Sequence, residues 1–298
     1  MAEMASMAPI AGAQFNWVSE FAPESIQRSL SYFTGWISTL AWQAGNSWGL
    51  ILIGTLFQSI IMVNFPDYEA PSWHGTLIVI GFTGVALCAN IFGAKLLPYW
   101  QNAVFALHIL AYAGFIIPIW INGPRVESAK VWSQFENTGG WSSMGLSVLI
   151  GQLPGMACQV GIDAAAHMSE EVRDAATAVP IVMMATWVIN YLTIFVALLT
   201  IVYHMPDIPA ALKDSTDYPV IYVLRETMSL AWLNVVLTVI LVLLLLGNLS
   251  SLAGVTRDIY AFARDQGLPY SDWISKVDKK RNIPTNACLL SGAICALL

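Results

Sequence analysis

The sequence carries little charge for its length. Of its 298 residues, 11% are Asp, Glu, Lys or Arg, whereas 57% are hydrophobic. A water-soluble domain of this size has no room to bury so much apolar surface. The formal net charge of −6 also excludes a basic face that could neutralise nucleic-acid phosphates. We therefore expect a protein that crosses a membrane several times and has no nucleic-acid partner.

Cysteine and histidine are also scarce. The chain has four of each, and its cysteines, Cys88, Cys158, Cys288 and Cys295, all lie in apolar stretches. No CxxC pair and no histidine at ligand spacing accompanies them, so packing is a better interpretation than a disulfide framework or a metal site. Residues 1–15 lack the basic start and the continuous apolar core of a signal peptide. We expect no cofactor, and we expect insertion to depend on the membrane spans themselves.

Long apolar segments take up most of the chain. About 20 residues are needed to cross the hydrocarbon of a bilayer. By this measure the last apolar segment, at residues 285–298, is too short to span and is incomplete. The sequence predicts a single all-α transmembrane domain with spans at approximately residues 30–63, 74–94, 99–121, 141–168, 178–203, 230–263 and 285–298.

The segment 141–168 differs from the other spans because it contains helix breakers and a carboxylate. Pro154-Gly155 predicts a break near residues 154–161, with the helix resuming around Gly161 and Asp163 about one turn beyond, where a solute could reach it. In a bilayer, interrupted backbone survives only against protein or a wet cavity. An ionisable group at that depth indicates function, whereas the Pro-Gly pair alone could be a packing kink.

The basic residues are unevenly divided between the two sets of loops. Nine of the 13 Lys and Arg fall on one side and four on the other. Cytoplasmic loops carry the excess of basic residues. We therefore expect Met1 to be cytoplasmic and the loop around Asp67 to be outside.

Three stretches carry a family resemblance: EMASMAPIAGAQFNWVSEFAP at 3–23, GIDAAAHMSEEVRDAATAVP at 161–180 and NLSSLAGVTRDIYAFARDQGLP at 248–269. Together they resemble the amino acid–polyamine–organocation (APC) superfamily, and within it the fungal GABA and choline type permeases. Ala13, where the family usually has a second glycine, and Thr256, where serine is common, are mild departures.

The resemblance implies a fold of two inverted five-helix repeats, the leucine-transporter-like fold, in which discontinuous first and sixth helices form the substrate site. The predicted spans match the family's third to eighth helices and the start of the ninth, so the expected fold is partial. The first helix has no counterpart, and we expect the chain to be part of a longer product in which Met1 is an internal methionine and the protein continues beyond Leu298.

The resemblance also suggests a role for particular residues. The substrate-binding candidates are Met156, Ala157, Cys158, Gln159, Val160, Gly161 and Asp163. Glu170, Glu171 and Arg173 match a cytoplasmic gate, although a solvated helix end with the two glutamates opposite Arg173 is an equal alternative.

A proton-coupling site is suggested at a second place. His108 lies where family members often have a lysine that makes transport proton-linked, and Ser250 and Ser251 match hydroxyls facing that point. A hydrogen-bonded packing histidine is the alternative for His108, although its titration range suits a proton switch.

The function that the resemblance implies is proton-coupled secondary transport of an amino acid, GABA, choline or a polyamine across the plasma or vacuolar membrane. The alternatives are a non-functional or regulatory fragment of such a permease and an integral-membrane enzyme. No set of nucleophile, base and orienting group recurs at one depth, so an enzyme is not expected.

Overall fold

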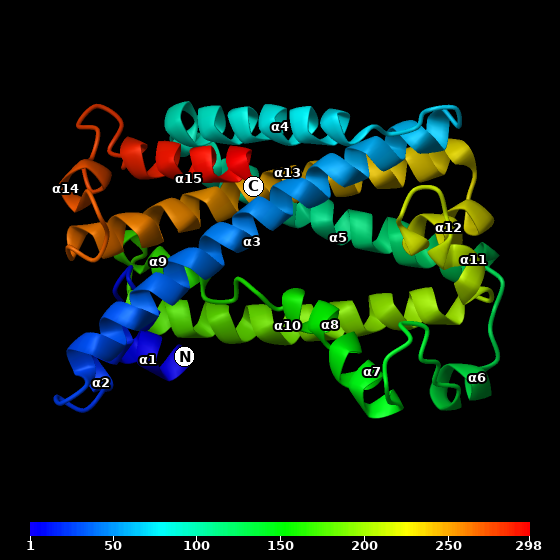
Figure 1. Cartoon of the computed structure of the whole chain (residues 1–298), viewed down its shortest axis with the longest axis horizontal. Coiled ribbons are helices and arrows are strands. Elements are labelled where there is room, and N and C mark those ends of the chain that lie inside the picture. The colour runs from blue at the N-terminus through cyan, green and yellow to red at the C-terminus, as the bar shows by residue number, and fades with distance from the viewer. The chain divides into compact units, whose positions relative to one another are not determined.

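The computed structural model describes residues 1–96 and 99–298, and helices account for most of them (Figure 1). Within these ranges no strand is present beyond one isolated bridge between Asp278 and Ile283. The expected all-α class is confirmed. The longer helices are α3 (Gln27–Asn64), α4 (Ser72–Phe92), α5 (Leu97–Asn122), α10 (Ala175–Tyr203), α13 (Leu230–Arg264) and α15 (Thr285–Leu297).

The remaining helices are short and lie in the connections. They are α1 (Ala2–Met7), α2 (Gln14–Phe21), η1 (Ala94–Leu96), α6 (Ser128–Ser133), α7 (Met144–Gly151), α8 (Leu153–Ala157), α9 (Ala164–His167), η2 (Ser169–Glu171), α11 (Ile208–Leu212), α12 (Pro219–Thr227) and α14 (Ser271–Ile274).

Five helices are long and apolar enough to cross a membrane. They are α3, α4, α10, α13 and the part of α5 at Tyr99–Asn122. At about 1.5 Å per residue, the 38 residues of α3 exceed what a hydrocarbon core requires. The protein is therefore an integral membrane protein.

The predicted broken span is the place where the helices differ most from expectation. Pro154 and Gly155 lie inside α8 instead of at the break, because proline is tolerated in a first helical turn, where its missing N–H has no partner to lose. The helix ends at Ala157, residues 158–163 form turns with Gly161 at φ +92°, and helix resumes at Ala164. Similarly, α10 begins at Ala175, earlier than predicted, so that Pro180 lies within it and not in its first turn.

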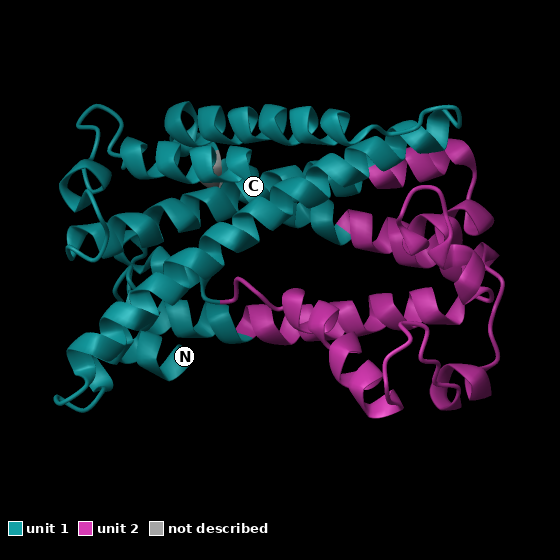
Figure 2. Ribbon diagram, in the orientation of Figure 1, with its two compact units in different colours: residues 1–109, 163–184, 238–298 teal, residues 110–162, 185–237 magenta. Residues whose placement is uncertain are grey.

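The chain forms two compact units (Figure 2). Unit 1 comprises residues 1–109, 163–184 and 238–298, and unit 2 comprises residues 110–162 and 185–237.

In unit 1, α3 packs against α2, α4 and α15. The face of α3 that is buried carries polar residues four positions apart, Thr39, Gln43 and Ser47. At Gly35 the backbone lies so close to α13 that an added Cβ would be 2.3 Å from the Phe262 ring. Small residues of this kind allow membrane helices to approach closely.

Unit 2 is held together by polar contacts between its helices as well as by apolar packing. The indole Nε1 of Trp120 donates to Thr200 Oγ1 at 2.9 Å, and the hydroxyl of Tyr112 donates to the carbonyl of Thr193 at 2.9 Å. Both bonds join α5 to α10, which fixes the rotation of one helix against the other.

Candidate functional site

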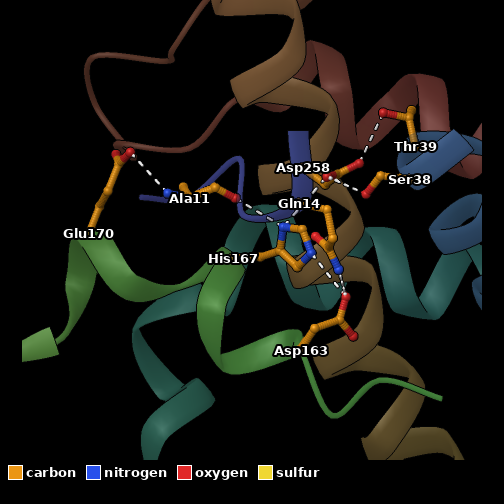
Figure 3. A network of polar contacts seen from close by, with 8 residues as sticks. All are labelled: Ala11, Gln14, Ser38, Thr39, Asp163, His167, Glu170 and Asp258. Atoms are coloured by element: carbon orange, nitrogen blue, oxygen red, sulfur yellow. Dashed lines mark hydrogen bonds and ion pairs between the residues drawn. The ribbon is translucent and has the colours of Figure 1, made fainter. Parts of the chain in front are cut away.

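The three sequence stretches that carry the resemblance meet in unit 1 around one side chain, His167 (Figure 3). His167 is the last residue of α9 and its side chain is fully buried. Its Nδ1 donates to the carbonyl oxygen of Ala11 at 2.9 Å and lies 3.5 Å from Oδ1 of Asp258. Its Nε2 lies 3.5 Å from Oδ2 of Asp163. The imidazole therefore has a carboxylate on each side and a backbone carbonyl as its hydrogen-bond acceptor.

Both ring nitrogens of His167 face oxygen atoms. When the two carboxyls are ionised, all of these oxygens are hydrogen-bond acceptors and none can donate. The carbonyl of Ala11 requires a proton on Nδ1, and a carboxylate beside Nε2 favours a proton there as well. A neutral imidazole would leave one lone pair facing an acceptor. The surroundings thus suit an imidazolium, which would form an ion pair with Asp163 and Asp258.

Asp258 is a carboxylate buried within the apolar helix α13. Its side chain has no exposed surface, and it accepts hydrogen bonds from Ser38 Oγ at 3.2 Å and Thr39 Oγ1 at 3.0 Å. A buried charge is tolerated only when it is paired and hydrogen-bonded. The two α3 hydroxyls and the imidazole of His167 meet that requirement.

Asp163 is the last of the turn residues 158–163, and its carboxylate is held by protein. Gln14 Nε2, from the first residue of α2, donates to Asp163 Oδ2, the oxygen that also faces His167. The Asp163 side chain keeps 16% of its surface exposed. A solute could still reach this carboxylate, but its main contacts are with α2 and α9.

The loop before α2 places its backbone groups in this network by adopting a strained conformation. The carbonyl of Ala11 accepts from His167, and its N–H donates to Glu170 Oε1 at 3.4 Å. Two residues later Ala13, which is fully buried, has φ +41° and ψ −106°. L-residues rarely adopt positive φ, and this is the position where the resemblance leads one to expect glycine.

The acidic pair predicted as a gate has different partners from those expected. Glu171 receives two bonds from Arg257, at 2.5 Å from Nε and 3.1 Å from Nη2. Glu170 faces Arg264 at 3.4 Å. Arg173 is exposed and forms no ion pair within the part of the chain that the structure describes. The idea that Arg173 opposes the glutamates is therefore wrong, because both acidic side chains of η2 point to arginines of α13.

A cavity of about 210 Å³ lies beside the network. His167, Glu170, Glu171 and Arg257 line it together with other residues of unit 1, including Asn90, Thr256 and Tyr260. Space for water-sized molecules therefore reaches the edge of the network, while the His167 side chain itself stays fully buried.

The predicted substrate-binding stretch lies in unit 2, apart from Asp163 in unit 1. Met156 and Ala157 end α8, while the residues from Cys158 to Gly161 form turns. Met156 and Val160 are 61% and 73% exposed. The amide oxygen Oε1 of Gln159 is buried and has no hydrogen-bond partner among the described residues.

The structure does not join the proposed proton-coupling residues by hydrogen bonds. His108 is exposed on α5, and among the residues that the structure describes it has no hydrogen-bond or ion-pair partner. Ser250 accepts from Gln101 Nε2 at 2.8 Å. Gln101 is seven residues before His108, so the α5 residue in contact with Ser250 is two turns away from the predicted one.

Sequence reasoning missed His167, Asp258 and Gln14 as site residues. A signal existed for two of them. Asp163 and His167 are four residues apart, a spacing that places side chains on one helical face. Asp258 follows a long apolar run in the same helix. Gln14 had no signal beyond its place in the first stretch, since only the fold brings α2 to α9.

Comparisons with known proteins support the family resemblance that the three stretches carry. The profile of the family described as "Amino acid permease" matches residues 1–298. A Macrophomina phaseolina protein named for amino acid/polyamine transport is 30% identical, with 99% of this chain and 66% of the relative covered. The GABA-specific permease of Saccharomyces cerevisiae is 26% identical over 100% of this chain and 54% of its own length. The choline transporter of the same yeast is 24% identical over 100% and 53%, respectively.

The chain thus spans between about half and two thirds of the length of these relatives. The match nevertheless extends over all of its own residues. The resemblance drawn from the three stretches is confirmed, and the chain belongs to the amino acid permease family.

Proposed function

We propose that the protein is a secondary transporter of amino acids or related amines, with GABA, choline and polyamines as the first candidates. Relatives named for these solutes cover nearly all of the chain. The observation that carries the proposal is Asp163, a partly exposed carboxylate directly after the non-helical residues 158–162. A carboxylate at the end of a non-helical segment suits a solute that has an ammonium group.

The substrate site in this proposal consists of Met156, Ala157, Cys158, Gln159, Val160, Gly161 and Asp163. The exposed side chains of Met156 and Val160 and the unpaired Oε1 of Gln159 support it. The N–H groups of Cys158, Gln159 and Val160 bond to carbonyls of α8. In this proposal the carbonyls of the turn residues themselves bind the ammonium group of the solute.

The ion pairs of η2 with α13 are the proposed cytoplasmic gate. Glu170 with Arg264 and Glu171 with Arg257 join two segments that must separate if the site is to open on that side. Met1 is cytoplasmic in this account, because nine of the 13 basic residues then lie inside. The membrane is the plasma membrane or the vacuolar membrane.

Transport is proposed to be coupled to protons. His108 remains the candidate that the family resemblance supplies, with Ser250 and Ser251 as its hydroxyl partners. However, His108 is exposed on α5 and Ser250 bonds to Gln101. Another ionisable group is therefore a candidate for binding the transported proton.

Substitution of Asp163 tests the proposed site. In the full-length protein reconstituted into liposomes, Asp163→Asn should weaken uptake of GABA, choline and basic amino acids by about tenfold or more, because a desolvated charge contact contributes on the order of 1.5–3 kcal/mol. Asp174→Asn, eleven residues further along the chain in an exposed turn, is the matched control and should transport normally. Unchanged affinity and rate for Asp163→Asn across the whole panel would contradict the assignment.

A further inference from the structure

The ionisable groups around His167 differ from the other charges of unit 1 in being buried as a set. His167 and Asp258 have fully buried side chains, and Asp163 is 16% exposed. Two carboxylates and one imidazole therefore share a site from which water is largely excluded. The cost of burying charge depends steeply on net charge, so the number of protons in this set matters for the stability of the arrangement.

The other charged groups near His167 already have partners. Glu170 is paired with Arg264 and Glu171 with Arg257. On the α3 side the neighbour is the uncharged ring of Trp42, whose centroid is 5.2 Å from that of His167. The three groups alone therefore carry a net charge of −2 with a neutral imidazole and −1 with an imidazolium when both carboxyls are ionised.

The contacts of His167 change with its protonation. An imidazolium can donate from Nδ1 to Ala11 and offer its other N–H to Asp163, as the atoms are placed here. Loss of a proton leaves one nitrogen lone pair facing an oxygen lone pair. Either the bond to the loop before α2 or the contact with Asp163 must then give way.

The proton therefore influences how several elements are held together. His167 joins α9 to the loop before α2 and to α13, and Asp258 extends the network to Ser38 and Thr39 of α3. His167 also borders the cavity of about 210 Å³, so water-sized space lies close to the buried ring.

We propose that His167, together with Asp163 and Asp258, is the proton-binding site that couples transport to the proton gradient. This inference rests on the proposed transport function. A protonated imidazole bonds to the loop before α2 and pairs with Asp163 at the same time, and release of the proton ends one of these two contacts. Asp163 links this site to the solute, because an ammonium group near its carboxylate would compete with the imidazolium for the same negative charge.

The test uses His167→Gln in the full-length protein, with His74→Gln as the matched control, because His74 bonds to Tyr68 near the start of α4 and has no proposed role in transport. His108→Gln is prepared alongside as the rival proton site. A glutamine amide can still donate to the carbonyl of Ala11 but does not titrate. Two assays are run in liposomes: exchange of labelled for unlabelled solute at equal pH, and accumulation driven by a difference of one pH unit. For one proton per solute that difference supports at most about tenfold accumulation.

We expect the unmodified protein and His74→Gln to accumulate solute, and His167→Gln to exchange solute but to reach an accumulation ratio of about one. Pumping by His167→Gln with the normal pH profile would overturn the inference, and so would loss of pumping in His108→Gln alone. If His167→Gln does not fold, Asp258→Asn replaces it. That change removes one of the two carboxylates that stabilise the proton, so the midpoint of the pH profile should move to lower pH, and an unmoved midpoint would count against the proposal.

A second readout separates this inference from the transport function. In detergent, a cysteine at Val277, which lines the cavity, is labelled with a soluble maleimide at several pH values. Its rate is compared with that of a cysteine at the exposed Lys279. A pH-dependent ratio that disappears in His167→Gln supports the proton site even when no solute exchange is found for any amine. A ratio independent of pH in the unmodified protein contradicts it.

Discussion

Ala13 shows how one residue can store strain next to a functional network. It has φ +41° and is fully buried at the start of α2. The loop must turn sharply here so that Ala11 can bond to both His167 and Glu170. Glycine adopts positive φ without the steric cost that a Cβ imposes.

Ala13→Gly should therefore stabilise the protein. A non-glycine residue in such a region costs on the order of 1–3 kcal/mol, and glycine loses part of this gain through the entropy of the unfolded chain. We expect a net gain of about 1 kcal/mol, measured as a rise of about 2 °C in the midpoint of thermal unfolding in detergent.

The control for this prediction is Ala5→Gly, which makes the same change within α1 and should lower the midpoint, because glycine is a poor helix former. A fall in the midpoint for Ala13→Gly would show that the strain is compensated by contacts of the alanine methyl group.

At the scale of the element, the crossing of α3 and α13 depends on glycine on one side and an aromatic ring on the other. The ring of Phe262 lies between Gly35 and Gly267, and a Cβ at either glycine would come within 2.3 Å of a ring carbon. Phe15 and Trp36 pack around the same ring, with centroids 5.3 and 6.2 Å away. Phe262 is therefore buried among these side chains.

Gly35→Ala should consequently destabilise the protein by about 1–3 kcal/mol, the usual cost of adding a methyl group to a filled core. The measurement is again the unfolding midpoint in detergent. Gly45→Ala in the same helix is the control, because a Cβ there meets no atom within 4 Å. Equal effects of the two substitutions would mean that the helices separate easily at this crossing.

The elements show where sequence reasoning succeeds and where it fails. The apolar runs predicted the long helices, because twenty or more apolar residues in a row have few alternatives to a membrane helix. The position of the break in the segment 141–168 was less well predicted. A proline can either end a helix or occupy its first turn, and only the structure shows that Pro154 does the latter.

The sequence indicated which regions contribute to the candidate site, but not which residues pair within it. The three stretches meet around His167, where Asp163 contacts Gln14, and Glu170 and Glu171 pair with arginines of α13. Their roles in substrate binding and gating stay predictions. Their partners lie far away in sequence, for example Arg257 at a separation of 86 residues from Glu171. Periodicity within one helix carries no information about such pairs.

At the scale of the whole molecule, the distribution of basic residues predicts the orientation in the membrane. A cysteine at Glu69, in the exposed loop between α3 and α4, should react with an impermeant maleimide in intact cells. A cysteine at Lys279, before α15, should react only after permeabilisation. Cys88 and Cys158, whose side chains are exposed, are first replaced by alanine. The reverse labelling pattern would invert the topology.

The central claim is that the protein moves amines through a binding site that opens alternately to the two sides of the membrane. Solute counterflow tests this claim most directly. Liposomes containing the full-length protein are loaded with an unlabelled solute and diluted into a trace of the labelled one, with GABA, choline, a polyamine and a basic amino acid each tried in turn. The account predicts that at least one labelled solute rises transiently above equilibrium inside these liposomes, and that Asp163→Asn reduces the peak. Labelled solute that never exceeds the level in protein-free liposomes, for every member of the panel, would contradict the account.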